Sequence, residues 1–357
     1  MTTSQDSERE VAHESEPELA TPGASQSSGW QSAMRGVFQR GGYASFGARY
    51  ALVGVWIALT LFYIVDESDV FFTSGTFQTI FGSQQAYVFL GMAAVITFAV
   101  GEFDLTIAAN MAFAAVIVPV LVVQHGWPEW LAAVAALAIV TGIGAVTALI
   151  VVRMAIDPII TTLGMSTLVG GIATKITGGN TVSGLSDSFA TVANTQLLFD
   201  LPISFYYGLV LVAIVAYIMR FTALGRHMAF VGANREVARL AGVRVGLIRG
   251  GSYIVSAFLC GLGGVILVAS LGGFDASTAT GYLLPALSAT FLGTAAIWPG
   301  RFNPIGTFVA IYFLVTGIVG LQLMGAASWV SDVFYGGALI IAVVISTLAR
   351  RRALATG

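Results

Sequence analysis

The sequence predicts an all-α polytopic membrane protein with about ten transmembrane helices. Of its 357 residues, 57% are hydrophobic and 10% are charged, whereas soluble domains carry about 25% charged residues. A second observation is that apolar runs recur along the chain, each close to the roughly 17–25 residues that a helix needs to cross a bilayer. The ten expected spans are residues 50–65, 84–100, 105–123, 130–152, 158–177, 203–220, 251–271, 282–298, 304–324 and 332–349.

The distribution of arginine predicts the orientation of these spans. An even number of spans places both chain ends on one side, and the arginines fall before the first span and after the fourth, sixth, eighth and tenth. The positive-inside rule makes that side cytoplasmic, so we expect a multi-pass protein of the plasma or inner membrane with both termini in the cytoplasm. The bases on this side are Arg35, Arg40, Arg49, Arg153, Arg220, Arg226, Arg235, Arg239, Arg244, Arg249, Arg301, Arg350, Arg351 and Arg352. Apart from Lys175, the charges expected on the other side are Asp66, Glu67, Asp69, Glu129, Asp187, Asp200 and Asp275.

The chain divides into four regions by composition. Residues 1–33 hold six acidic side chains and one arginine with few apolar residues, so we expect a disordered acidic cytoplasmic tail. Residues 34–49 combine arginines with aromatic residues, which is typical of a basic juxtamembrane segment. Residues 50–349 form the membrane domain, and 350–357 a short cytoplasmic tail. Without the acidic tail, the rest has 12 acidic and 15 basic side chains, an excess too small to indicate a nucleic-acid partner.

Two connections between spans look internal to the membrane domain. Gly101-Glu102-Phe103-Asp104 and Gly272-Gly273-Phe274-Asp275 both fit the pattern Gly-x-Phe-Asp-x-[Thr/Ser]. Paired interruptions of this kind can mark a substrate path between two repeats, here spans one to five and six to ten, although a chance match of so few residues remains an alternative. Acidic groups at membrane depth are functional candidates because charge is costly there, but Asp104 has the alternative role of capping the third span. The candidate path or gate residues are Glu102, Phe103, Asp104, Phe274 and Asp275.

The most highly charged connection is residues 222–250, which contain five arginines. Within it, residues 234–242 are predicted to form a short helix that begins at the N-cap Asn234 and stops at Gly242. Glu236 in its first turn and Arg239 later in the helix agree with the helix dipole. The alternative is a solvated basic loop lying near anionic lipid.

The sequence lacks the motifs of several other function classes. No phosphate-binding Gly-x-x-x-x-Gly-Lys-[Ser/Thr] motif occurs, because the one lysine, Lys175, is followed by Ile176. No histidine lies in a span, and no pair of aspartates lies in expected helices, so neither a serine nor an aspartyl intramembrane protease is predicted. The one cysteine, Cys260, allows no disulfide within the chain, and no Cys/His cluster indicates a metal. We therefore expect no catalytic residue, no metal and no cofactor in this chain.

Several blocks resemble the permeases of ribose- and xylose-type ABC importers, a family that shares a superfamily with the branched-chain amino acid permeases. The most specific is Gly225-Arg226 followed by residues 231–243, which is similar to that family's cytoplasmic motif. Residues 101–106, 158–165, 281–293 and 300–307 are similar to further blocks in the same order, and the resemblance covers about residues 50–350.

The resemblance implies a membrane subunit of a sugar importer that assembles as a homodimer or heterodimer of permeases. It implies separate ATPase subunits that bind ATP, and an extracytoplasmic solute-binding protein. Residues 234–242 would then be the helix that couples this chain to the ATPase. The implied coupling residues are Gly232, Asn234, Arg235, Glu236, Arg239 and Gly242.

The chain departs from the family pattern at positions near the expected path. Glu102 stands where the family has the second glycine of a Gly-Gly-Ile-Asp block, and Leu283 and Pro285 replace an acidic pair. The expected solute is accordingly no more specific than a monosaccharide or polyol. The alternative function is an ion-coupled secondary transporter without an ATPase, which would require acidic groups near the middle of the membrane.

Overall fold

The computed structural model describes residues 42–66, 68–71 and 73–355. The predicted disordered tail, residues 1–33, and the bases Arg35 and Arg40 lie outside the described residues. The chain divides into two units at Phe46, and the second, Gly47–Gly357, is the helical body.

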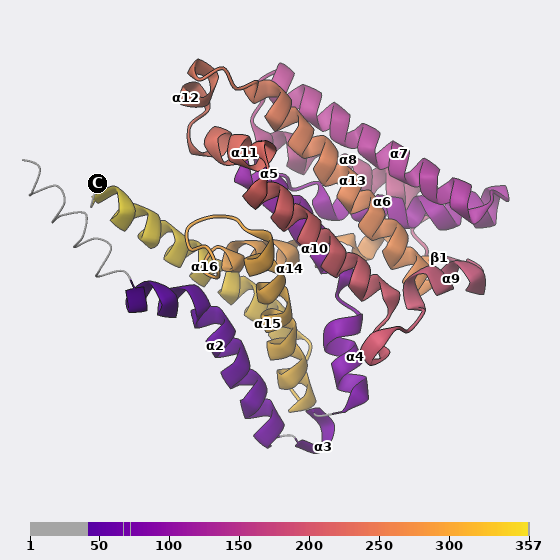
Figure 1. The fold of residues 1–357 in the computed structure, drawn as a ribbon. Helices are drawn as coiled ribbons and strands as arrows, with labels where there is room; N and C mark the ends of the chain where they lie inside the picture. Colours follow the sequence, from indigo (N-terminus) through magenta and orange to yellow (C-terminus); the bar gives the residue numbers. More distant parts are fainter. Residues whose placement is uncertain (1–41, 67, 72, 356–357) are drawn as a thin grey trace, which may run out of the picture. The chain divides into compact units, whose positions relative to one another are not determined.

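The helical body contains long helices joined by short ones and one pair of two-residue strands (Figure 1). The α-helices are α2 (Gly42–Asp66), α3 (Ser68–Phe71), α4 (Ser74–Gly82), α5 (Gln85–Ala99), α6 (Ile107–Pro119), α7 (Glu129–Ala148), α8 (Pro158–Thr177), α9 (Asp187–Asn194), α10 (Ile203–Phe221), α11 (Ala223–Ala233), α12 (Arg235–Leu240), α13 (Val245–Leu271), α14 (Thr280–Gly293), α15 (Pro304–Leu323) and α16 (Trp329–Ala355). The π-helical turns are η1 (Val120–Gln124) and η2 (Leu149–Arg153), the 3₁₀ turns are η3 (Leu198–Asp200) and η4 (Ala276–Ala279), and the strands are β1 (Val182–Ser183) and β2 (Gly273–Phe274).

Eight helical segments in the described part of the chain are long and apolar enough to cross a membrane, which confirms an all-α polytopic membrane protein. They are Arg49–Asp66, Ser74–Ala99, Ile107–Gln124, Glu129–Arg153, Pro158–Thr177, Ile203–Phe221, Val245–Leu271 and Pro304–Leu323. The last expected span, residues 332–349, lies within α16.

The expected span 282–298 is wrong in length. Its helix, α14, has 14 residues and ends at Gly293, so it is about 21 Å long and cannot cross a hydrocarbon core of about 30 Å. The chain turns after it because the side-chain amide of Asn303 donates to the carbonyl oxygens of Gly293 (3.0 Å) and Ala296 (3.1 Å). Asn303 also caps α15, as the Asn-Pro pair predicts.

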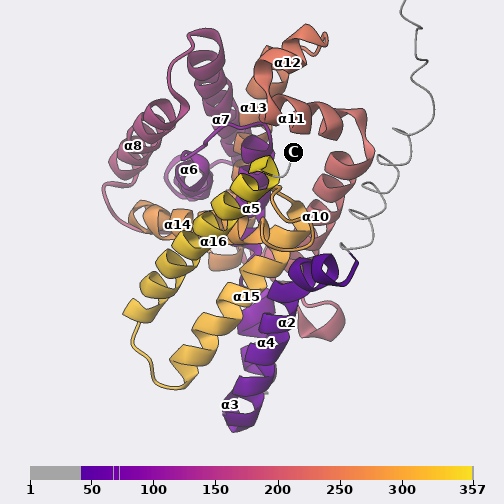
Figure 2. The same ribbon diagram turned by 90° about the vertical axis from the view of Figure 1, so that its left-hand side faces the viewer.

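Helix α13 lies at the centre of one group of helices and contacts α5, α6 and α7 (Figure 1). Glycine makes the closest of these contacts, because a Cβ at Gly264 would overlap the carbonyl oxygen of Met111 in α6. A second group is formed by α14, α15 and α16, which Figure 2 shows side by side. Helix α5 contacts both groups.

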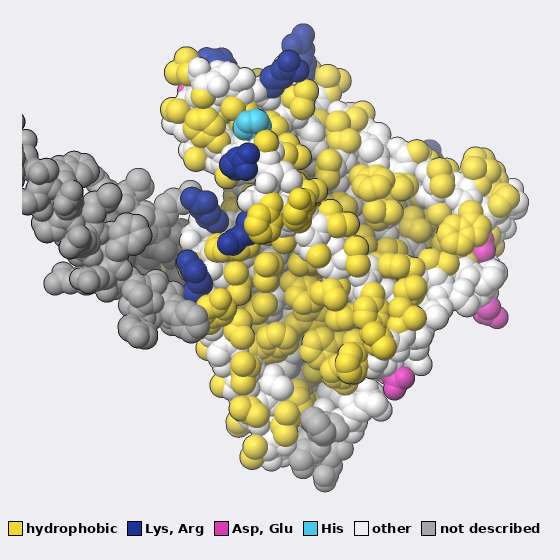
Figure 3. Space-filling view, in the orientation of Figure 1, with side chains coloured by type: hydrophobic (Ala, Val, Ile, Leu, Met, Phe, Trp, Pro, Cys, Tyr) yellow, Lys and Arg dark blue, Asp and Glu magenta, His cyan; other side chains and the backbone are white. Residues whose placement is uncertain are grey.

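The two ends of α13 mark opposite ends of the helical body. Helices α11 and α12 lie beyond its first residue, and β1, β2 and α9 lie by its last (Figure 1). Its 27 residues correspond to about 40 Å. Figure 3 shows Lys and Arg side chains around α11 and α12 and farther down the same side of the body, and Asp and Glu side chains toward α9. The segregation of charge expected from the sequence is therefore visible on this face.

Candidate functional site

The short helix predicted in the 222–250 connection is present as α12, and its ends have the predicted causes. The side-chain oxygen of Asn234 accepts hydrogen bonds from the backbone N–H groups of Glu236 (3.0 Å) and Val237 (3.1 Å), which satisfies two donors at the helix start. After the helix, Gly242 has a φ of +81°, a conformation that favours glycine. The connection predicted at residues 222–250 is shorter in the structure, because α13 begins at Val245 and so includes Arg249.

Helix α12 presents a charged and apolar face to its surroundings. Arg239 donates to Glu236 at 2.7 Å, and both side chains are 70% exposed. Leu240 is 85% exposed and Val237 is 48% exposed, whereas Ala238 between them is fully buried. We call Glu236, Val237, Arg239 and Leu240 the α12 face.

The start of α12 is fixed to the helical body by a buried carboxylate. Glu102, in the loop between α5 and α6, has no exposed surface. Arg235 at the start of α12 pairs with it at 2.9 Å, and Arg249 in α13 pairs with the same oxygen. The Tyr253 hydroxyl donates to the other oxygen at 3.1 Å. We call Glu102, Arg235, Arg249 and Tyr253 the Glu102 cluster, and it joins three segments through one side chain.

Two backbone contacts bring α11 and α12 close to the end of α5. Arg235 also donates to the carbonyl oxygen of Gly101, at 2.8 Å. Gly232, the last residue but one of α11, lies so close to α5 that a Cβ would overlap the carbonyl oxygen of Ala99. The implied coupling residues Gly232 and Arg235 therefore face the helical body, while Glu236 and Arg239 face away from it.

Asp104 lies two residues beyond Glu102 and joins α6 to α13. Its carboxylate accepts hydrogen bonds from the Thr106 backbone N–H (2.9 Å), the Thr106 hydroxyl (2.5 Å) and the Ser256 hydroxyl (2.8 Å). Burial raises the pKa of the Asp104 carboxyl, and the hydrogen bonds from Thr106 and Ser256 oppose that rise. Asp104 thus meets a donor at the start of α6, as the capping alternative predicted, although Thr106 occupies the N-cap position.

The five candidate path residues do not form one site. Glu102 contacts Arg249 and Tyr253 in the first half of α13 and Asp104 contacts Ser256 near its middle, whereas Phe274 and Asp275 follow its last residue. Phe103 is 42% exposed, and Phe274 is buried in strand β2, where it pairs with Val182 of β1.

The two Gly-x-Phe-Asp segments nevertheless share a local structure. Gly101 and Gly272 both have left-handed backbones, with φ of +80° and +72°. In each segment the aspartate accepts from the backbone N–H two residues on, Thr106 at 2.9 Å and Ser277 at 2.8 Å. The shared local geometry agrees with a repeat between the two halves of the chain, and the repeat itself stays a prediction.

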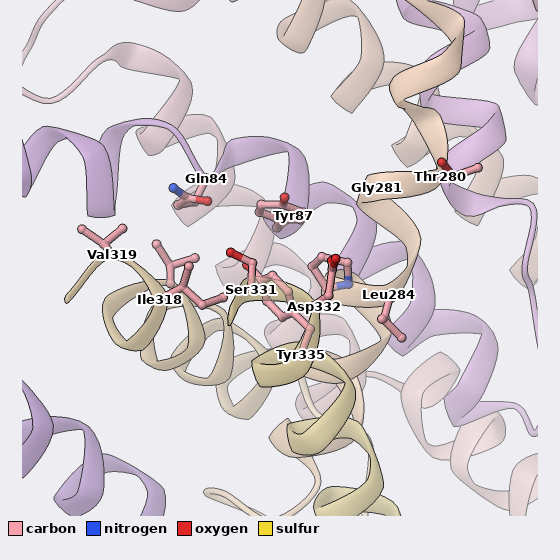
Figure 4. Close-up of a pocket in the computed structure, with 12 residues that line it drawn as sticks. Gln84, Tyr87, Thr280, Gly281, Leu284, Ile318, Val319, Ser331, Asp332 and Tyr335 are labelled. Carbon is pink, nitrogen blue, oxygen red and sulfur yellow. The ribbon is translucent and has the colours of Figure 1, made fainter. Parts of the chain in front are cut away.

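A cavity that the sequence did not indicate lies between α5, α14, α15 and α16. It has a volume of about 410 Å³. Its lining comes from segments up to about 250 residues apart in the chain, so no local pattern could have found it. Figure 4 shows Gln84 and Tyr87 of the α5 end across from Ser331, Asp332 and Tyr335 of the α16 end.

The comparisons with known proteins agree with the fold class. Residues 76–343 match the family model described as "Branched-chain amino acid transport system / permease component". The chain is 28% identical to the autoinducer 2 import system permease protein LsrC of Enterobacter sp. (strain 638), over 87% of this chain and 88% of the relative. It is 29% identical to the autoinducer 2 import system permease protein LsrD of Klebsiella pneumoniae, over 71% and 77%. No solved structure matches the chain.

Proposed function

Because the chain belongs to the branched-chain amino acid transport system permease family, we propose that it is the translocation subunit of an ATP-binding-cassette importer for a small hydroxylated solute. Members of this group are membrane permeases and not enzymes, so ATP hydrolysis is assigned to partner subunits. The observation that supports coupling most directly is α12, a short capped helix that is fixed to the helical body on one side and exposes Leu240 on the other.

The α12 face is proposed to bind an ATPase subunit. A short helix with exposed apolar residues and a charge pair can insert into a groove of a partner, and Leu240 and Val237 supply the apolar contact. The Glu102 cluster is proposed to transmit movement of α12 to the loop between α5 and α6. Phe103, exposed beside it, is then the nearest candidate gate residue.

The proposed location is the plasma or inner membrane, with both termini in the cytoplasm. The arginines of α11, α12 and the start of α13 support this orientation through the positive-inside rule. Extracytoplasmic solute is then delivered by a binding protein to the opposite end, beside β1, α9 and the start of α16. A second permease subunit, identical or related, completes the proposed assembly.

The solute is proposed to be sugar-like and not an amino acid. The relatives named above are components of autoinducer 2 import systems. An amino-acid zwitterion needs a cationic partner for its carboxylate, and the cavity at the proposed entry end is lined by no Lys, Arg or His. The one base expected on that side, Lys175, lies in the last turn of α8.

The test is co-purification and transport in the native host. A tag on this chain should recover ATPase subunits from solubilised membranes, and uptake into vesicles should require internal ATP. Replacing Glu236→Arg and Arg239→Glu together reverses the charges of the α12 face and should reduce both recovery and uptake. Tyr217→Phe, on an exposed part of α10, is the matched surface control. Uptake that is driven by a proton gradient without ATP would instead identify the ion-coupled carrier.

A further inference from the structure

The cavity between α5, α14, α15 and α16 has the composition of a binding site for a hydroxylated molecule. Six polar residues line it, and the remaining wall is formed by aliphatic residues such as Pro285 and Ile318. Its volume of about 410 Å³ lies within the range of about 300–1,000 Å³ that small-molecule sites occupy. The polar residues are Gln84, Tyr87, Thr280, Ser331, Asp332 and Tyr335.

Most of these polar groups have hydrogen-bonding capacity to spare. Gln84 uses its amide N–H to donate to the Thr79 carbonyl oxygen (2.9 Å), and Ser331 accepts from Gln322 at 3.3 Å. Within the described residues, the side-chain oxygens of Tyr87, Thr280, Asp332 and Tyr335 have no hydrogen-bond partner. Thr280 and Asp332 are exposed and Tyr87 and Tyr335 are partly buried, so the hydroxyls of a solute can replace water as their hydrogen-bond partners.

The chemistry of the side chains that line the cavity determines which class of solute it can bind. Each hydroxyl of a sugar both donates and accepts, which matches a set that contains one carboxylate, one amide and four hydroxyl groups. The lining includes no Lys, Arg or His, so the carboxylate of an amino acid would find no cationic partner and would lie close to the carboxylate of Asp332. The cavity therefore favours a neutral polyol over a zwitterion, although the family description mentions amino acids.

The position of the cavity fits the route of an imported solute. It is formed by the first residues of α5, α14 and α16 and the end of α15. Under the proposed orientation, these are the extracytoplasmic ends of the helices, so an incoming molecule meets them before it reaches the loop of Glu102.

We propose that this cavity is a transient binding site for a neutral polyhydroxylated solute of about the size of a pentose, with Asp332 accepting hydrogen bonds from solute hydroxyls. The inference rests on the proposed function, because it assigns a site to that importer's solute. It adds the place of the binding site and the residues that bind the solute.

Protection from thiol modification tests the site directly. Ser331→Cys places a thiol in the lining, and the native Cys260 is fully buried, so the unsubstituted chain shows the background. The intact transporter in right-side-out and inside-out host membrane vesicles is treated with a charged, impermeant methanethiosulfonate reagent. D-ribose, D-xylose and ribitol are the probes, and L-leucine is the contrasting solute. Ser328→Cys, exposed in the connection before α16 and outside the lining, is the matched control.

The expected result is that Ser331→Cys reacts in right-side-out vesicles and that at least one of the three polyols slows the reaction several-fold. L-leucine should have no effect, and Ser328→Cys should react equally with and without polyol. Adding Asp332→Asn should abolish the protection while leaving the reaction itself intact.

Three results would overturn the site. They are an absence of protection by all three polyols, equal protection by L-leucine, and protection that survives Asp332→Asn. Failure of the proposed function looks different. If both cysteines react only in inside-out vesicles, the orientation of the importer is wrong, whatever the cavity binds.

Discussion

The carboxylate of Glu102 forms an ion pair with the guanidinium of Arg235 at 2.9 Å, across 133 residues of sequence. Glu102 is fully buried, whereas the Arg235 side chain is 41% exposed, so the pair connects the interior of the helical body to the start of α12. Arg249 and Tyr253 hold the same carboxylate from α13. A displacement of α12 should therefore move the α5–α6 loop with it.

Replacing Glu102→Gln should loosen α12 and destabilise the protein. The change leaves Arg249, whose side chain is 17% exposed, without a counter-charge, and breaking a buried pair in this way costs about 3 kcal/mol. Thermal unfolding in nanodiscs should show a lower Tm, and hydrogen exchange of residues 234–243 should become faster. The matched control is Glu236→Gln, which removes an exposed pair that is worth about 0.2–1 kcal/mol. Equal effects of the two substitutions would show that the Glu102 cluster does not fix α12.

Gly232→Ala should separate α11 from α5. Its Cβ would overlap the Ala99 carbonyl oxygen, and since that atom belongs to the backbone, a helix must move to make room. We expect a lower Tm and weaker recovery of the ATPase in co-purification. Gly251→Ala is the control, because nothing lies within 4 Å of its Cβ in α13 and alanine favours a helix by about 1 kcal/mol over glycine. A Gly232→Ala protein as stable as Gly251→Ala would contradict the close contact.

Asn234→Ala should fray α12 without affecting the rest of the fold. Loss of the two hydrogen bonds to the N–H groups of Glu236 and Val237 costs about 1 kcal/mol of helix stability. Hydrogen exchange should accelerate within α12 and remain unchanged in α10 and α13. Asn234→Asp keeps an acceptor at this position and should retain protection. If both variants exchange alike, the cap does not determine the stability of α12.

Local features were predictable from the sequence because their causes are local. The cap at Asn234 and the long apolar helices depend on neighbouring residues. The partner of Glu102 was not predictable, since no pattern relates it to Arg235 and Arg249. The sequence suggested a path or gate role for Glu102, and that role stays a prediction, but its ion pairs make it equally a structural link.

The end of α14 and the cavity could not be predicted from the sequence either, because both depend on contacts that form only in the folded chain. Residues 294–298 are mostly apolar and extend the hydrophobic run, but Asn303 bonds back to Gly293 and ends the helix earlier. The cavity depends on four helices that meet only after folding.

The buried carboxyl of Asp104 should make stability depend on pH in the direction opposite to that of an ion-paired carboxylate. Burial raises the pKa of Asp104 in the folded protein above its unfolded value, so the folded state holds a proton more tightly. The resulting stabilisation is complete below the unfolded pKa and is lost as pH rises through the folded pKa.

Asp104→Asn removes this titration and keeps an oxygen that can accept from Thr106, while its amide can donate to the Ser256 hydroxyl. Thermal unfolding across a range of pH should therefore show a loss of stability with rising pH for the unsubstituted chain, and a smaller loss for Asp104→Asn. Ser256→Ala is the matched variant. It removes the hydrogen bond from Ser256, and because that bond lowers the pKa of Asp104, its removal should raise the pKa further and enlarge the loss of stability. Identical pH profiles for all three proteins would show that Asp104 does not titrate in this range.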